Sequence, residues 1–214
     1  MVELQICPFT KSDTKSGHGL AEFGVPVANI AYPFSNASKN NLPLLFYHVW
    51  LSIFQMVRLG PTKVSSILLA APAFDDDFPL WSGPMFAMLE TSVAAIMEAQ
   101  AEIGVVCFHP HYKIPNEQSG FPGFGQMHSI TKLQSFVVVV DDATKTLTRN
   151  DIAAGGAWQR RTPHATINVL RADQLQQAEG RRNTGLLYAR NIRVLTDLGS
   201  EKLQTDLHYE QNLV

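Results

Sequence analysis

The chain has 214 residues, of which 45% are hydrophobic and 17% are charged, and its formal net charge is −2 at pH 7. This balance indicates a packed globular core and argues against disorder. The near-neutral charge gives no indication of a nucleic-acid partner, and two cysteines are too few for a disulfide framework. We therefore expect a soluble protein from a reducing compartment.

The first half of the chain alternates short apolar runs with longer segments of helical periodicity. Ser38 to Asn41 can cap the first helix, and Gly60 can end it. Strands are predicted at 25–34, 63–72 and 104–109, and helices at 42–59 and 85–102.

Residues 42–60 form an apolar run long enough to raise the question of a membrane span. The run contains His48, Ser52, Gln55 and Arg58, and such polar groups are costly in lipid but normal on an amphipathic helix. We predict a core helix with one polar edge, and no transmembrane segment.

The second half of the chain is less regular. Residues 113–129 are rich in Gly, Pro and polar side chains, which predicts a loop. After it we predict a strand at 134–142, a loop at 148–158, a strand at 165–171, and helices at 172–180 and 184–199.

The order of these elements predicts one α/β domain over residues 1–214, with a layered, partly parallel sheet flanked by helices. Ligands of such sheets bind beyond the carboxyl ends of the strands. Three predicted strand ends therefore mark the expected site: Ala71-Pro72, His109-Pro110 and Leu170-Arg171.

The segment CFHPHYKIP, 107–115, places Cys107, His109 and His111 at alternate positions. At about 3.3 Å per extended residue, the first and last of these lie roughly 13 Å apart and cannot share one ion. A zinc site that combines His109 with Cys7, His111 or His164 stays open as an alternative. Cys107, inside an apolar run, is expected to be core.

A thiol site is a second interpretation. Cys7 precedes Pro8, and a thiol that lies near His109 and arginines could have a lowered pKa and act as a nucleophile. His109 would then be the general acid or base. The alternative is that Cys7 is a small buried hydrophobe.

An anion site is a third interpretation. Seven of the nine arginines lie between residues 160 and 193, and the guanidinium fork suits carboxylate or phosphate. Arg161 precedes a predicted strand and Arg171 ends it, while Arg190 and Asn191 lie in the last predicted helix and could face the same place. Ordinary ion pairs are the alternative for each of these residues.

Four segments occur in an order that resembles the bacterial and plastid family called domain of unknown function 1415. They are ICPFTK near the start, FHPHYKI in the middle, and RRTPHATINVLR and LYARNIRVLTDLG near the end. The segment SSILLAAPAFDDDFPLW also resembles a strand and helix start of that family, so that the match covers most of residues 4–199. The name of the family states that its activity is not established.

The resemblance points to particular positions and also shows departures. Asn168 stands where the family has His, His164 and Ala165 replace Tyr and Pro, and Arg160 replaces Asn. Residues 115–157 are longer than the family's spacing and are interpreted as an insertion with its own strand. The positions that match the family's motifs are Cys7, Pro8, Phe9, His109, Pro110, Tyr112, Arg161, Pro163, Arg171, Arg190 and Asn191.

Three functions follow as hypotheses. The first is an enzyme acting on a small anionic substrate through Cys7, His109 and arginines, with Tyr112 among the binding residues. The second is a non-catalytic binding or assembly module that meets a protein partner through 115–157. The third is a zinc-dependent hydratase or hydrolase. The resemblance implies cytoplasm or plastid stroma, and no cofactor can be named.

Overall fold

A mixed five-stranded sheet lies at the centre of the computed structural model, which describes residues 12–18, 24–114, 128–140, 146–173 and 184–213. The strand order is β1-β2-β3-β5-β4. β2 and β3 are parallel, and the other neighbouring pairs are antiparallel. The strands are β1 (Lys15–Ser16), β2 (Ala28–Ala31), β3 (Val64–Ala70), β4 (Ile103–Phe108) and β5 (Thr166–Arg171). The predicted α/β class, with a partly parallel sheet flanked by helices, is confirmed.

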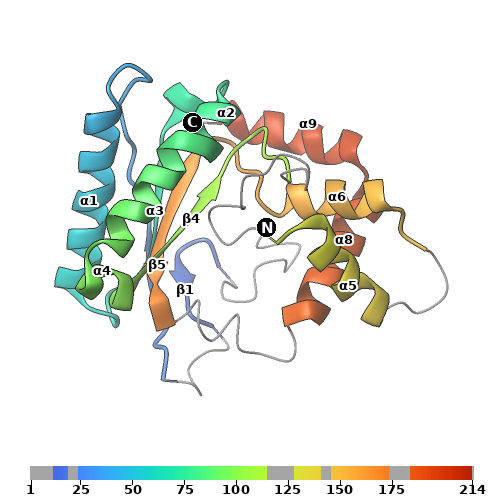
Figure 1. The fold of residues 1–214 in the computed structure, drawn as a ribbon, viewed down its shortest axis with the longest axis horizontal. Coiled ribbons are helices and arrows are strands. Elements are labelled where there is room, and N and C mark those ends of the chain that lie inside the picture. The colour runs from blue at the N-terminus through green and yellow to red at the C-terminus, as the bar shows by residue number, and fades with distance from the viewer. Residues whose placement is uncertain (1–11, 19–23, 115–127, 141–145, 174–183, 214) are drawn as a thin grey trace.

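One face of the sheet is covered by α1 (Leu42–Leu59), α3 (Phe86–Ala94) and α4 (Met97–Glu102), which lie on the left of Figure 1. Helix α1 begins where the Asn41 side chain accepts a hydrogen bond from the Leu44 N–H. It ends at Gly60, whose φ of +77° is readily adopted only by glycine. The predicted bounds and caps of this helix are confirmed.

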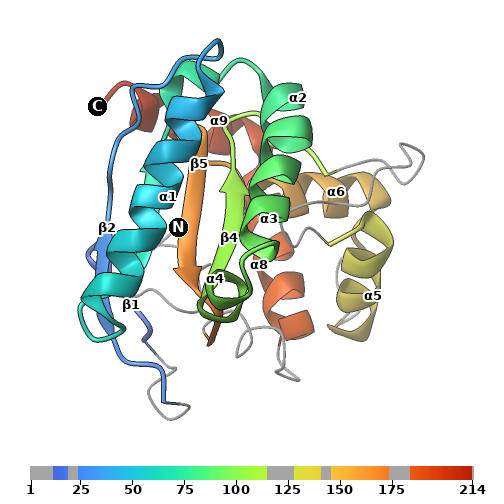
Figure 2. The same cartoon turned by 60° about the vertical axis from the view of Figure 1, so that its left-hand side comes forward.

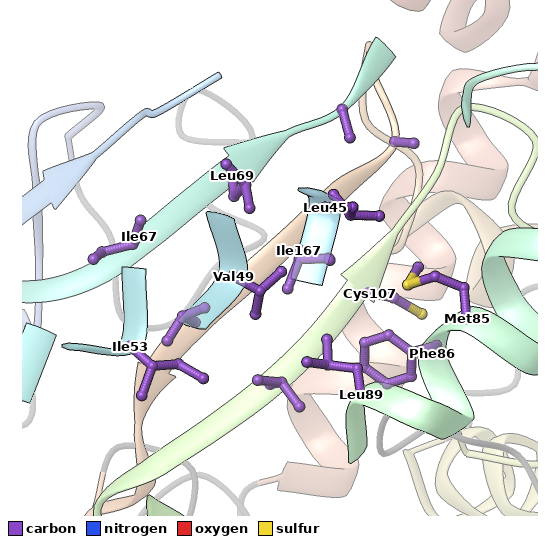
Figure 3. Close-up of a cluster of buried hydrophobic side chains, with 14 of the residues drawn as sticks. Leu45, Val49, Ile53, Ile67, Leu69, Met85, Phe86, Leu89, Cys107 and Ile167 are labelled. Atoms are coloured by element: carbon purple, nitrogen blue, oxygen red, sulfur yellow. The ribbon is translucent and has the colours of Figure 1, made fainter. Parts of the chain in front are cut away.

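The main core fills the space between these helices and the sheet (Figure 3). Inward side chains alternate along β3 and β5, as extended strands require, and they meet a helical stripe of α1. On the α3 side the core is closed by Phe86 and Leu89. Labelled members of this core are Leu45, Val49, Ile53, Ile67, Leu69 and Ile167.

The predicted continuous helix at 85–102 is wrong. A short α2 (Phe78–Leu80) and a π-helical turn (Trp81–Met85) precede α3, and α4 starts only after Ile96. Ile96 is extended, with φ −108° and ψ 99°, so the helical hydrogen bonds stop there. Apolar spacing alone did not reveal this break because apolar residues continue on both sides of it.

A second group of helices lies on the right of Figure 1: α5 (Ile130–Val140), α6 (Arg149–Trp158), α8 (Thr184–Leu198) and α9 (Ser200–Gln211). The strand predicted at 134–142 is wrong, since 134–140 belong to α5, and the loop predicted at 148–158 is wrong because α6 occupies it. Leu133 and Val137, one helical turn apart, are buried against α6 and α8, so packing outweighs the strand preference of the valines. Thr148 and Asp151 form a capping box that starts α6.

The insertion proposed at 115–157 is only partly described. Residues 115–127 and 141–145 lie outside the described residues, and the remainder forms α5 and most of α6. Its predicted strand is replaced by helix, but whether it is an insertion remains a prediction. Most of the helix predicted at 172–180 also lies outside the described residues.

Candidate functional site

The C-terminal ends of β3 and β4 lie beside the start of β5, at one end of the strands of the sheet. Thr166 pairs with Ala70 on one side and with Phe108 on the other. Because β5 runs antiparallel to both neighbours, its last residue, Arg171, pairs with Ile103 at the opposite end of the strands. The structure therefore brings Ala71, His109 and the start of β5 together, and it does not bring Arg171 to them.

Arg171 is buried and holds the backbone at its own edge. Its Nε donates to the Val64 carbonyl at 3.1 Å, and a terminal nitrogen donates to the Met56 carbonyl at 2.8 Å. The Met56 carbonyl lies in the last turn of α1 and also accepts from the Gly60 N–H at 3.2 Å, so Arg171 adds a second bond to it. This geometry gives Arg171 a structural role and leaves it far along β5 from the other predicted residues.

His109 is fully buried, with 0% of its surface exposed. Its Nδ1 accepts the His111 N–H at 3.0 Å, which leaves Nε2 protonated to donate to the Phe74 carbonyl at 3.0 Å. Burial lowers the pKa of His109 from 6.5, and the ring lies against Phe78 and Trp81. With both ring nitrogens engaged, this histidine is in a poor position to exchange a proton with a substrate.

His164 lies at the same edge and is held by Asp75. One carboxylate oxygen accepts from His164 Nδ1 at 2.8 Å, and the other accepts from the Ala165 N–H at 2.6 Å. Within the described ranges, no group of three His, Cys, Asp or Glu side chains could hold a metal ion. Cys7 lies outside those ranges, so its proposed part in a thiol or zinc site stays a prediction.

Cys107 is a free, buried thiol that points toward Met85 in the core (Figure 3). Burial is the main cause that raises its pKa to about 12, so at neutral pH it is a protonated hydrophobe. The prediction that Cys107 belongs to the core is confirmed.

The remaining predicted residues gather near α6. Arg161 stacks on Trp158, with its guanidinium carbon 4.1 Å from the ring centroid, and its Nε donates to the Tyr112 carbonyl at 3.3 Å. Arg190 is exposed on α8, whereas Asn191 is buried and donates from Nδ2 to Gln159 Oε1 at 3.2 Å. Asn191 thus positions a glutamine that the sequence did not single out.

A small pocket lies where the segment after β4 meets α5, α6 and α8, with a volume of about 20 Å³. This is room for one water molecule or one small polar group. Tyr112 is the one residue of the predicted set that lines it. The lining residues are Tyr112, Ile114, His128, Leu133, Gly156, Gln159, Arg160 and Tyr188.

The polar groups of this pocket favour an acceptor. Gln159 is 9% exposed, and its Nε2 amino group has no hydrogen-bond partner. Burial is the main cause that lowers the pKa of His128, and the positive charge of Arg160 lowers it further. The imidazole is therefore neutral at pH 7. Burial also raises the pKa of Tyr112 above its usual range, which keeps the hydroxyl protonated. Polar side chains and one cation therefore line an otherwise apolar cavity.

Sequence reasoning missed Gln159 and His128, whereas Arg160 belonged to the arginines considered for an anion site. Two signals were present: Gly155-Gly156 inside a segment of helical length, and Arg160 at a position where the resembled family has Asn. The glycines mark close helix packing beside the pocket, since a Cβ on Gly156 would lie 2.6 Å from a Leu133 methyl carbon.

The fold and the pocket define a mixed α/β protein with a helical group beside its sheet and a donor-lined cavity at their junction. Comparison of the chain with family models, with curated proteins and with solved structures gives no match.

Proposed function

We propose that this protein binds a small anionic ligand through the pocket beside α6. The observation that carries the proposal is the buried Nε2 of Gln159, which has no hydrogen-bond partner and belongs to a residue that lines the pocket together with Arg160. An unpaired buried donor costs roughly 1–3 kcal/mol, and a ligand oxygen that accepted from it would recover this energy.

A carboxylate group fits this pocket best. Arg160 supplies a planar donor fork that matches the two oxygens of a carboxylate, and Asn191 holds Gln159 so that its amino group stays available. The enclosed volume of about 20 Å³ suits one such group rather than an entire drug-sized ligand. The rest of the ligand would extend from the pocket.

A catalytic form of the proposal assigns proton transfer to His128 instead of His109. His128 lines the pocket and is kept neutral by burial and by the charges of Arg160 and Lys132, which lower its pKa. A neutral imidazole can act as a general base toward a bound ligand. Cys7 remains a proposed nucleophile, and the reaction is not specified by the pocket.

The other hypotheses have less support. The resemblance to the domain of unknown function 1415 family remains a proposal and supplies no reaction. A protein partner for 115–157 would depend in part on residues outside the described ranges. A zinc-dependent activity has no three-ligand group among the described residues and would need Cys7.

The test is ligand binding by matched variants. Wild type, Arg160→Gln and Arg190→Gln are melted with acetate, succinate, citrate, 2-oxoglutarate and inorganic phosphate, and saturation-transfer NMR detects binding directly. We expect a carboxylate to raise the melting temperature of wild type and Arg190→Gln but not of Arg160→Gln, because a ligand stabilises only the form that binds it.

Two outcomes would contradict the proposal. One is that none of these anions gives an NMR signal or a thermal shift with wild type. The other is that Arg160→Gln retains the full shift, which would show that the anion binds elsewhere.

A further inference from the structure

The outward side of α1 is apolar. The helix buries Leu45, Val49 and Ile53 against the sheet, and on its opposite side Tyr47 and Phe54 are 60% and 59% exposed. A helix on the surface of a soluble protein normally turns a polar face to water.

Leu51 completes this outward stripe at 38% exposure, because positions 47, 51 and 54 follow the i, i+4, i+7 spacing of one helix face. Helix α1 lies at the left margin of the molecule in Figure 1 and in front of the sheet in Figure 2, and the exposure of these three side chains places the stripe on its solvent side. By length and composition α1 could cross a membrane, but it packs along the sheet as a core helix.

Two exposed cations lie near the C-terminal end of the stripe. Between Gly24 and Phe74 the sequence has no Asp or Glu and has three cations: Lys39, Arg58 and Lys63. Lys39 is paired with Asp76. Arg58 follows Phe54 by four residues and lies on the same face of the helix. Both Arg58 and Lys63 are exposed, and neither has an ion-pair partner within the described part of the chain.

We propose that the outer face of α1 docks on an anionic lipid surface, with the helix lying in the plane of the membrane. Tyr47, Leu51 and Phe54 enter the boundary between headgroups and acyl chains, while Arg58 and Lys63 meet the headgroup phosphates. Apolar side chains beside cations are what interfacial helices use, and binding grows with buried apolar area and with anionic lipid.

A second copy of the chain fits this face less well. Two copies meeting through parallel α1 helices would bring Arg58 and Lys63 toward the same residues of the partner. Antiparallel helices would bring them toward the start of the partner's α1, and residues 24–74 contain no carboxylate to pair with them. Like charges that face each other oppose association.

The experiment uses the full chain and sedimenting vesicles of phosphatidylcholine, with and without phosphatidylserine. We expect wild type to bind the vesicles that contain phosphatidylserine and to be released by salt, which screens exposed charges. Phe54→Ser should lower the partition coefficient about tenfold, because a large apolar side chain no longer leaves water.

Arg58→Glu should weaken binding to the anionic vesicles and reduce its dependence on salt. The matched control is Val138→Ser, which removes an apolar side chain that is 72% exposed on α5, in the other helical group. We expect this control to bind as wild type does. Thermal melts of all variants show whether they remain folded.

The proposal fails if wild type binds neither kind of vesicle, if it binds both equally, or if Val138→Ser loses as much binding as Phe54→Ser. Sedimentation velocity without lipid tests the second copy. A wild-type dimer that Phe54→Ser converts to monomer, without vesicle binding, would assign the face to self-association and overturn lipid docking. Each of these results concerns the outer face of α1 and is independent of whether the pocket beside α6 binds an anion.

Discussion

At the scale of the residue, buried polar groups at the edge of the sheet are satisfied by one another. His109 bridges the Phe74 carbonyl and the His111 N–H, and Asp75 accepts from His164 and from the N–H of Ala165, the residue before β5. Such pairing is required because a buried polar group without a partner is costly. These groups therefore hold three segments of the chain together.

The state of His109 predicts a dependence of stability on pH. Its pKa in the folded protein lies below the ordinary value of 6.5, so the unfolded chain binds the proton more readily. The contribution of neutral His109 to the free energy of unfolding is complete above pH 6.5, and it is lost as the pH falls toward the pKa of His109 in the folded protein. The loss approaches about 1.4 kcal/mol for each pH unit and each such histidine.

Urea unfolding between pH 5 and 7.5 measures this slope. His109→Gln should reduce the slope relative to wild type, and His128→Gln should do the same because the pKa of His128 is also lowered. His208→Gln, at an exposed position of α9, is the control. An unchanged slope in His109→Gln would contradict the buried neutral state.

Cys107 gives a second prediction at this scale. With a pKa of about 12, about one thiol in ten thousand is ionised at pH 8, and only the thiolate reacts. In a Cys7→Ser background, a disulfide reagent such as DTNB should label Cys107 only after unfolding in urea. Rapid labelling of the folded variant would show that Cys107 is accessible.

At the scale of the element, the close packing of α6 on α8 depends on Gly155. A Cβ on Gly155 would lie 2.9 Å from the Ile192 carbonyl oxygen and 3.1 Å from Thr196 Oγ1. Because the first of these atoms is backbone, the two helices would have to separate. Their separation would also open the pocket that the end of α6 lines.

Gly155→Val should therefore lower the free energy of unfolding by about 3 kcal/mol, the upper range for overpacking. The matched variant is Ala154→Val, at an exposed position of the same helix, which should cost less than about 1 kcal/mol through helix propensity alone. Urea unfolding compares the two. Equal losses would show that the helix contact is loose.

At the scale of the whole molecule, the sheet separates two arginines that the sequence grouped together. Arg160 lies just before β5, at the edge that adjoins the pocket, and Arg171 ends β5 at the other edge. The first lines the pocket and lies over the Phe108 ring, 5.5 Å from its centroid, whereas the second ties β3 and the end of α1 to β5.

Arg171→Met should consequently lower the free energy of unfolding by about 3 kcal/mol, because two buried carbonyls lose a charged donor. The folded variant should bind the same anions as wild type does. Arg160→Gln should show the reverse, with lost binding and little change in stability. Loss of anion binding in a folded Arg171→Met variant would contradict this separation.

The sequence by itself determined the elements that local chemistry specifies. Asn41 and Gly60 bound α1, apolar runs gave three of the strands, and Gly199 ended α8. Periodicity could not show that 134–140 is helical, because Val137 becomes helical by packing against α6 and α8 rather than by its own preference. Only the tertiary structure decided the antiparallel direction of β5, which moves Arg171 away from His109 and brings His164 toward it. It also placed Gln159 and Arg160 beside Tyr112, since a pocket between distant segments is set by how the helices pack and not by any local pattern.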